Sequence, residues 1–229
     1  MESSVDGRLV VNRWTPPFDG KDIDEVTDVY THIKNDFQAG AWILGRKSAQ
    51  IHFFPNDFKS STRTPILSFE NWAGGIRSKR FFIIIDPNGK IEYDKNKLGD
   101  DAIITILGQE LVSEEYLEHL KRQGISYVFA GSDGTDLVKA MNALYDDFGI
   151  SLILLDGGGI TNGLFLKAGL IDELSLVLYP GIDGKSGVSS IFEYRGEDAF
   201  PASEQTLELM QVKPLENGIV WLRYKFHHK

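Results

Sequence analysis

One stretch of the sequence, residues 151–180, constrains the fold of this chain more than any other. It opens with an uninterrupted apolar run over 152–155, which is typical of a strand buried on both faces. Three consecutive glycines follow at 157–159, and glycine lets the backbone turn sharply and lets another group approach it closely. A short apolar helix and a second strand over 174–179 complete the stretch. The pattern predicts strand, glycine turn, helix and strand, which is the unit from which parallel sheets are built.

The start of that short helix is a candidate binding site. Thr161 or Asn162 is expected to cap the helix, and Gly169 is expected to end it. A glycine turn that leads into a helix N-terminus presents free N–H groups and a partial positive charge, which suit a phosphate group. Asn162 stands where the dinucleotide fingerprint of doubly wound folds has its last glycine, so the turn does not match that fingerprint. The turn is therefore either purely structural or a phosphate-binding turn of another kind.

Composition limits the classes of protein to which this chain can belong. Its 229 residues are 42% hydrophobic, and we expect one domain over residues 1–229 because no linker or repeat interrupts them. The formal net charge of −9 argues against binding to nucleic acid or to an anionic membrane. The absence of cysteine excludes disulfides and thiolate chemistry and fits a cytosolic protein. No apolar run reaches the roughly 18 residues of a membrane span.

Strand and helix patterns alternate through most of the chain. Apolar runs predict strands, and amphipathic segments with capping residues predict helices. An Asn-Gly pair between two apolar runs near the C-terminus predicts a β-hairpin. We therefore expect an α/β fold with a mostly parallel central sheet, helices on both faces and an antiparallel C-terminal hairpin. The expected strands are 41–44, 80–86, 101–107, 125–130, 152–155, 174–179, 207–212 and 219–226, and the expected helices before the glycine turn are 24–38, 114–122 and 136–148.

Residues 51–79 are the least regular part of the sequence. Prolines and the pair Gly74-Gly75 break any long helix or strand there, and irregular stretches of this length are usually functional or mobile. Aromatic residues are unusually frequent in this stretch. They are expected to pack over the sheet, with a substrate pocket as the alternative, and they are Phe53, Phe54, Phe58, Phe69 and Trp72.

Several catalytic classes lack the residues that they need. None of the five histidines is spaced with another ligand as in a metal site, so we expect no metal. No Gly-x-Ser-x-Gly elbow is present. Gly-Lys-Ser at 184–186 ends like a phosphate loop, but Tyr179 replaces the first glycine of that motif and Pro180 opposes a helix. Hydrolase, metalloenzyme and nucleoside-triphosphate interpretations are therefore set aside.

Three segments resemble motifs of a known enzyme group. Residues 156–174, DGGGITNGLFLKAGLIDEL, resemble the EGG…FLxxGL(V/I)DEL segment of the reductase domain of bacterial riboflavin biosynthesis, a relative of dihydrofolate reductase. Ser4–Leu9 resembles the SxDG(R/K)(I/L) motif near the start of that domain, and Gly45–Ser48 resembles the GRx(T/S) turn of dihydrofolate reductase-like proteins. The resemblance implies a dihydrofolate reductase-like fold, NADPH as the cofactor, a small-molecule substrate and a homodimer paired through a sheet edge.

The N-terminus departs from that family. The family motif follows a central strand, whereas almost nothing precedes Ser4 here. We therefore expect an unfilled or makeshift sheet position near residues 1–5. An exposed strand edge there would make pairing between two chains more useful, because a partner can cover exposed backbone.

The glycine turns supply the candidate cofactor site. Gly45, Gly131 and Gly157 each follow a predicted strand, and ligands of open parallel sheets bind beyond the carboxyl ends of strands. Three loops should therefore converge on one rim. The cofactor phosphates are expected at the turn and helix start, which comprise Gly157, Gly158, Gly159, Ile160 and Thr161.

The turn that resembles GRx(T/S) supplies the candidate cations. The field of a helix end stabilises an anion by only about 0.3–1 kcal/mol, so positive side chains must help to hold phosphates. Arg46 and Lys47, followed by Ser48, are the candidates, and a cation that binds a 2′-phosphate would favour NADPH. The alternative for each charge is an ordinary solvated loop.

Two acids are candidates for the reacting end of the site. Asp6 lies in the SxDG-like motif, and Asp156 stands where the family has a glutamate before its paired glycines. Either could donate or relay a proton while a nicotinamide supplies hydride. Alternatively, Asp6 caps a turn and Asp156 orders the glycine loop.

The sequence as a whole indicates an NADPH-dependent reductase of a small heterocycle or of another C=N, C=O or activated C=C compound. The first alternative, implied by the resemblance, is the reductase of riboflavin biosynthesis, whose substrate is a ribosylaminopyrimidinone phosphate. Asp156 in place of glutamate, and the absence of the family segment TxDDPxLxxR, depart from that alternative. The second alternative is a nucleotide-binding domain without catalysis.

Overall fold

The chain forms two compact units in a computed structural model that describes residues 1–60, 66, 68–75 and 78–228. The first unit combines Met1–Gln38 with Gly157–Lys229, and the second is the continuous segment Ala39–Asp156. Each unit holds a sheet of its own, and the single domain expected from the sequence stays a prediction.

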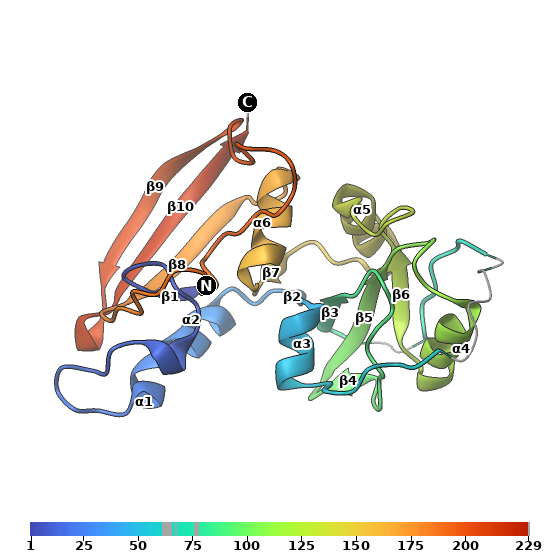
Figure 1. The fold of residues 1–229 in the computed structure, drawn as a ribbon, viewed down its shortest axis with the longest axis horizontal. Helices are drawn as coiled ribbons and strands as arrows, with labels where there is room; N and C mark the ends of the chain where they lie inside the picture. The colour runs from blue at the N-terminus through green and yellow to red at the C-terminus, as the bar shows by residue number, and fades with distance from the viewer. Residues whose placement is uncertain (61–65, 67, 76–77, 229) are drawn as a thin grey trace. The chain divides into compact units, whose positions relative to one another are not determined.

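A six-stranded sheet lies at the centre of the second unit (Figure 1). Its strands are Ala41–Gly45 (β2), Phe81–Ile85 (β3), Lys97–Leu98 (β4), Asp101–Leu107 (β5), Ser126–Phe129 (β6) and Ile153–Leu155 (β7). The order is β4-β5-β3-β2-β7, with β6 also paired to β5, and every pair is parallel except β4 with β5. The predicted mostly parallel sheet is confirmed.

Burial of these strands follows their place in the sheet. Every residue of β3 is buried, and so is β5 after its first residue, as expected for apolar runs at the centre of a parallel sheet. β7 is the edge strand of this sheet and is only half-buried, and Leu152 before it is exposed. The expectation that 152–155 is buried on both faces is therefore wrong.

Most aromatic residues of the irregular segment pack on the core of the second unit. Phe54 is buried in that core, and Phe53, Phe58 and Trp72 are partly buried against it. Phe69 is exposed. The expected packing over the sheet is confirmed for the first four, while residues 61–65, 67, 76 and 77 lie outside the described part of the chain.

Three helices accompany this sheet, namely Arg46–His52 (α3), Glu114–Gln123 (α4) and Leu137–Phe148 (α5). Ser113 directly precedes the helix predicted over 114–122 and is the N-cap of α4, because its hydroxyl accepts a hydrogen bond from Tyr116 N. Thr135 directly precedes the helix predicted over 136–148, but the N-cap of α5 is Asp136, whose carboxylate accepts a hydrogen bond from Lys139 N. Val138, which helical spacing places on the buried stripe of α5, is 49% exposed.

A four-stranded sheet organises the first unit (Figure 1). Its strands are Glu2–Ser4 (β1), Glu173–Tyr179 (β8), Gln205–Pro214 (β9) and Val220–His228 (β10), in the order β1-β8-β10-β9. β1 is parallel to β8, and the other two pairs are antiparallel. The predicted C-terminal hairpin is confirmed, and its turn uses the Asn-Gly pair, with φ of 59° at Asn217 and 75° at Gly218.

The sheet position near the N-terminus is filled. β1 is an ordered strand that ends at Ser4, and Met1 O accepts a hydrogen bond from Val177 N of β8. Of the two alternatives expected near residues 1–5, the unfilled position is therefore wrong, and the makeshift position stays a prediction. The strand has three residues and pairs on one side only within the described chain, so it is a short edge strand.

The helices of the first unit are Ile23–Thr27 (α1), Val29–Asp36 (α2) and Gly159–Lys167 (α6). The single helix expected over 24–38 is thus two shorter helices, separated at Asp28. Val26, which spacing places on the buried stripe, belongs to the residues whose side chains are not described, while Ile33 is buried as expected. No helix in the described residues has the length and apolarity needed to cross a membrane.

Candidate functional site

Three neighbouring strands of the second unit bring candidate residues to one rim of its sheet. Gly45 ends β2 and lies opposite Ile85 of β3, so Asp86 follows at the same edge. On the other side of β2, Asp156 N donates a hydrogen bond of 3.0 Å to Ile43 O. Gly45, Asp86 and Asp156 therefore share the carboxyl rim, where open parallel sheets bind ligands.

Gly131 reaches the same rim at a greater distance. It follows β6, which is separated from β2 by β5 and β3, so at about 4.8 Å per strand it lies roughly 14 Å along the rim from Gly45. Its φ of 76° requires glycine, and its carbonyl accepts a hydrogen bond from Gln109 N. The structure thus gives Gly131 a turn-forming role and does not make it a neighbour of Gly45.

The predicted turn Gly45–Ser48 is in fact the start of α3, with its first residue as the N-cap. The Arg46 guanidinium donates a hydrogen bond to Gln50 Oε1, and its Nε lies 3.8 Å from Asp86 Oδ1. Lys47 is exposed and makes no hydrogen bond or ion pair within the described residues, while the serine of the turn is half-buried. Of the two predicted cations, Lys47 is therefore the more available to a ligand.

Asp86 is a site residue that the sequence patterns did not single out. Its side chain is fully buried, and Oδ2 accepts hydrogen bonds from Lys90 N at 2.6 Å and Ile91 N at 2.9 Å. Oδ1 has no hydrogen-bond partner in the described chain and faces Arg46. Burial raises the pKa of Asp86, against the opposing effects of the two backbone N–H groups and the guanidinium. An acid directly after five apolar strand residues is the signal that could have revealed it.

The glycine bend of the first unit leads directly into α6. Gly157 has a φ of 99°, the Gly157–Gly158 peptide bond is cis, and Gly158 is the N-cap of the helix. Thr161 and Asn162 lie inside the first turns of α6, so the expectation that one of them caps the helix is wrong. The reason is that glycine backbone alone forms the cap, without any side-chain hydrogen bond.

The first turn of α6 offers backbone donors. The N–H groups of Gly159, Ile160 and Thr161 precede the first intrahelical hydrogen bond, which Asn162 N donates to Gly158 O. None of the three makes a hydrogen bond to any other described residue. A row of such donors at a positive helix end fits an anion.

Two glycines of α6 are required by packing within the chain. A Cβ on Gly159 would lie 2.1 Å from Ser190 O, and one on Gly163 would lie 2.2 Å from Glu193 O. Glu193 N also donates to Gly159 O, and Asn162 Nδ2 donates to Ile191 O at 2.7 Å. The close approach expected at the glycine bend is therefore made, at least at Gly159, by the segment 190–193.

Asp6 is tied into a turn of the first unit. Ser4 Oγ donates to Asp6 Oδ1 at 2.6 Å, and the N–H groups of Asp183 and Gly184 donate to its two carboxylate oxygens at 3.1 and 2.8 Å. The hydrogen bond from Ser4, followed by that from Gly184, lowers the pKa of Asp6 to about 2. Asp6 is therefore ionised at neutral pH and orders the turn, and a catalytic role for it stays a prediction.

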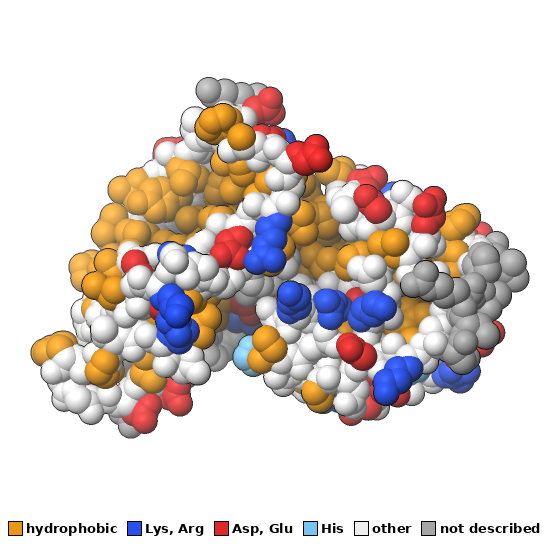
Figure 2. Space-filling view, viewed as in Figure 1, with side chains coloured by type: hydrophobic (Ala, Val, Ile, Leu, Met, Phe, Trp, Pro, Cys, Tyr) orange, Lys and Arg blue, Asp and Glu red, His pale blue; other side chains and the backbone are white. Residues whose placement is uncertain are grey.

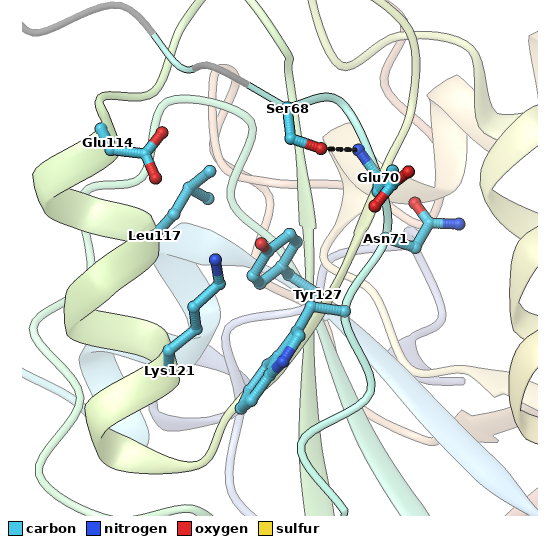
Figure 3. Close-up of a pocket in the computed structure, with 8 residues that line it drawn as sticks. Ser68, Glu70, Asn71, Glu114, Leu117, Lys121 and Tyr127 are labelled. Atoms are coloured by element: carbon cyan, nitrogen blue, oxygen red, sulfur yellow. Dashed lines mark hydrogen bonds between the residues drawn. The ribbon is translucent and has the colours of Figure 1, made fainter.

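A small cavity lies elsewhere in the second unit, between α4 and β6 (Figure 3). Its volume is about 80 Å³, and Lys121 and Leu117 of α4 point toward Tyr127. Burial, followed by nearby Glu114 and Glu70, raises the pKa of Tyr127 to about 12. None of the predicted catalytic or cofactor-binding residues lines this cavity, whose walls are Ser68, Glu70, Asn71, Trp72, Glu114, Leu117, Lys121 and Tyr127.

No group of three or more His, Asp or Glu side chains in the described residues is arranged to hold a metal ion. Each unit thus offers candidate residues of its own, at the rim of Gly45, Asp86 and Asp156 in the second unit and at the bend Gly157–Thr161 in the first.

The fold is similar to that of two solved proteins that are named as a reductase or as reductase-like. The fold resembles that of a pyrimidine reductase-like protein from Corynebacterium diphtheriae, with a TM-score of 0.68 and 20% identity over 100% of this chain and 90% of that one. It also resembles riboflavin biosynthesis reductase Rib7 of Saccharomyces cerevisiae, with a TM-score of 0.53 and 16% identity over 99% and 85% of the two chains. The predicted class, an α/β fold of the dihydrofolate reductase type, is confirmed.

The sequence places the chain in a family. Residues 1–221 match the RibD C-terminal domain, and the chain belongs to that family. Part of it, 128 residues or 56% of the chain, is 27% identical to the 2,5-diamino-6-ribosylamino-4(3H)-pyrimidinone 5′-phosphate reductase of Aquifex aeolicus. The match spans 55% of that protein's length. The resemblance drawn from the three sequence motifs is confirmed.

Proposed function

We propose that this chain is a reductase that converts a ribosylaminopyrimidinone 5′-phosphate to its ribitylamino form at the expense of NADPH. The observation that carries the proposal is the bend Gly157–Thr161, which presents free backbone donors in a chain of the RibD C-terminal domain family. The name of the Aquifex relative supplies the substrate class, and the family resemblance supplies the cofactor. A cytosolic location and a homodimer stay predictions.

The donor set fits a dinucleotide phosphate group. The N–H groups of Gly159 and Ile160 would hold the diphosphate, because they have no other acceptor in the described chain. Taken by itself, the second unit offers Lys47 as a cation for a phosphate, while Arg46 is already held by Gln50 and Asp86. When bound, the nicotinamide supplies the hydride.

The reaction also needs a proton from the protein or from water. Reduction of the C=N bond of the opened ribosylamino group places one hydride on carbon and one proton on nitrogen. Asp156 follows β7 at the carboxyl rim and directly precedes the glycine bend, so it is the proposed donor or relay. Asp6 holds no proton at neutral pH and would only order its turn.

The test is reduction assayed directly with the full chain. NADPH consumption should depend on the ribosylaminopyrimidinone 5′-phosphate, and NADPH should raise the melting temperature more than NADH does. A chain that is stabilised by ATP alone and consumes no NADPH with any acceptor would be a non-catalytic nucleotide-binding domain, and the proposal would fail.

A more general reductase is the second candidate. The absence of the TxDDPxLxxR segment and the presence of Asp156 in place of glutamate favour a different small heterocycle or another C=N, C=O or activated C=C substrate. Complementation of a riboflavin auxotroph separates the two candidates. Growth supports the pyrimidinone substrate, whereas NADPH consumption with other acceptors and no growth supports the general reductase.

A further inference from the structure

The cavity between α4 and β6 is built from residues that take no part in the candidate sites described above (Figure 3). One wall is a stripe of α4, because Glu114, Leu117 and Lys121 follow one another at the three- and four-residue spacing of a single helix face. Buried Tyr127, the second residue of β6, also lines it. The cavity therefore lies inside the second unit and toward the amino end of β6, away from the carboxyl rim.

The wall opposite α4 is held in place by the chain itself. Trp72 and Tyr127 exchange two backbone hydrogen bonds of 3.0 Å each, and their rings are stacked with centroids 6.1 Å apart. The side chain of Asn71 accepts a hydrogen bond from Phe129 N and donates one to Asp147. The cavity is thus largely formed before any ligand arrives, as small-molecule sites usually are.

Three polar groups of this cavity have no hydrogen-bond partner within the described chain. The Lys121 ammonium and the Glu70 carboxylate make no hydrogen bond or ion pair with a described residue, and they do not pair with each other. The Tyr127 hydroxyl makes no hydrogen bond there either. Burial raises the pKa of Tyr127 to about 12, so this hydroxyl keeps its proton at neutral pH and can donate it. Buried tyrosines usually have a partner for that group.

We propose that this cavity binds a small free α-amino acid in its zwitterionic form. The Lys121 ammonium and the Tyr127 hydroxyl would donate to its carboxylate, and the Glu70 carboxylate would accept from its ammonium group. Trp72 also lines the cavity, and an indole face stabilises an ammonium group. The volume is about 80 Å³, and one water needs about 10–15 Å³ of such space, so roughly six non-hydrogen atoms fit, the size of alanine.

A ligand with both charges fits the cavity better than a ligand with one. A simple anion would meet Lys121 but also the carboxylates of Glu70 and Glu114, and a simple cation would meet those carboxylates but also Lys121. Either ligand would thus face a like charge, which disfavours binding. Figure 2 shows acidic and basic side chains interspersed over the second unit, so the visible surface there has no field of a single sign.

Isothermal titration calorimetry with the purified full chain and L-alanine tests the proposal. Alanine should bind with a dissociation constant of about 1 mM or lower, which is within reach of a ligand of this size. Acetate and methylamine each carry one of its two charges and should bind about tenfold more weakly or not at all. No saturable binding of alanine up to about 10 mM overturns the proposal, and so does acetate or methylamine binding as tightly as alanine.

Substitutions at exposed positions show whether alanine binds in this cavity. Lys121→Met and Glu70→Gln should fold, because both side chains are exposed, and each should weaken alanine binding about tenfold. The matched controls are Glu118→Gln on α4 and Lys139→Met on α5, which lie outside the cavity and should bind alanine like wild type. Wild-type affinity in both Lys121→Met and Glu70→Gln overturns the proposal. The assay contains no NADPH, so its result is independent of any reductase activity.

Discussion

Two glycine turns follow the neighbouring strands β2 and β7, and they are held in different ways. The turn after β2 is held by side chains, because buried Asp86 faces Arg46 and Arg46 donates to Gln50. The bend after β7 is held by backbone packing, because Ser190 O leaves no room for a Cβ on Gly159. A glycine after a strand therefore does not by itself indicate a binding site, since it can accommodate a ligand, a turn or another part of the same chain.

The largest expected effect is at the packed bend. Gly159→Ala should destabilise the protein by about 2–3 kcal/mol, because the new methyl group would lie 2.1 Å from Ser190 O and the segment must shift. Urea denaturation measures the loss. Gly40→Ala is the matched control, since its Cβ would be 3.9 Å from Leu152 O. Equal stability of the two variants would show that segment 190–193 is free to move.

The next effect concerns chemistry at the end of β7. Asp156→Asn should lower kcat about 100-fold if the acid transfers a proton, because general acid catalysis contributes on this scale. The KM for NADPH should change little. Steady-state kinetics separates the two quantities, and a parallel loss of both would make Asp156 a structural residue of the bend.

The side-chain-held turn should respond to a change of its buried acid. Asp86→Asn should destabilise the protein by about 1–3 kcal/mol, because the buried amide would serve Lys90 N and Ile91 N less well as an acceptor. The folded-state pKa of Asp86 is raised, so its contribution is fully present below the unfolded-state pKa and is lost as pH rises through the folded-state value. The stability gap between wild type and variant should therefore narrow as pH rises. Asp57→Asn, at an exposed acid that accepts a hydrogen bond from Gln50, is the control and should lower stability less than Asp86→Asn does at every pH tested.

A smaller effect is expected from the exposed cation of that turn. Lys47→Ala should weaken NADPH binding about fivefold, since one exposed charge pair contributes up to about 1 kcal/mol. Calorimetric titration at two salt concentrations should also show a weaker salt dependence. Lys97→Ala, on β4 near the opposite edge of the sheet, is the control and should bind NADPH like wild type. Identical binding by Lys47→Ala would remove this residue from the cofactor site.

The smallest effect, opposite in sign to that of Asp86, belongs to Asp6. Its folded-state pKa is lowered to about 2, so its contribution is present above the unfolded-state pKa and is lost as pH falls through about 2. Asp6→Asn should lower the melting temperature slightly at neutral pH, and the difference from wild type should narrow in acid. A difference that widens in acid would contradict the hydrogen bonds seen at this turn.

Much of the fold follows from local patterns. β5 has the predicted bounds, 101–107, because its apolar run is long and lies at the centre of the sheet. The C-terminal hairpin forms where the Asn-Gly pair predicts it, since few other residues tolerate two successive positive φ values. Where the apolar pattern and the turn residues indicate the same element, the sequence alone is sufficient to predict that element.

The predictions fail where the structure of a segment depends on contacts with parts of the chain that are distant in sequence. The sequence predicts that α6 starts at Thr161, whereas the helix starts at Gly159. Gly159 fits there because its carbonyl accepts a hydrogen bond from segment 190–193 and because it has no Cβ to collide with that segment. Local patterns do not predict β1, because its partner strand begins at Glu173, far away in the sequence. Of the candidate site, the rim at Gly45 and Asp156 was predictable from strand ends, whereas Asp86 became visible only through its burial next to Arg46.

The division of the chain has a consequence for its synthesis. The second unit is one continuous segment, so all of its strands are available as soon as residue 156 has been made. The first unit needs segments made before and after the second, because Glu2 pairs with Val177 of β8, and β9 and β10 follow β8. We therefore expect the second unit to fold during synthesis while the first is still incomplete, and pulsed hydrogen exchange on stalled chains would reveal that order.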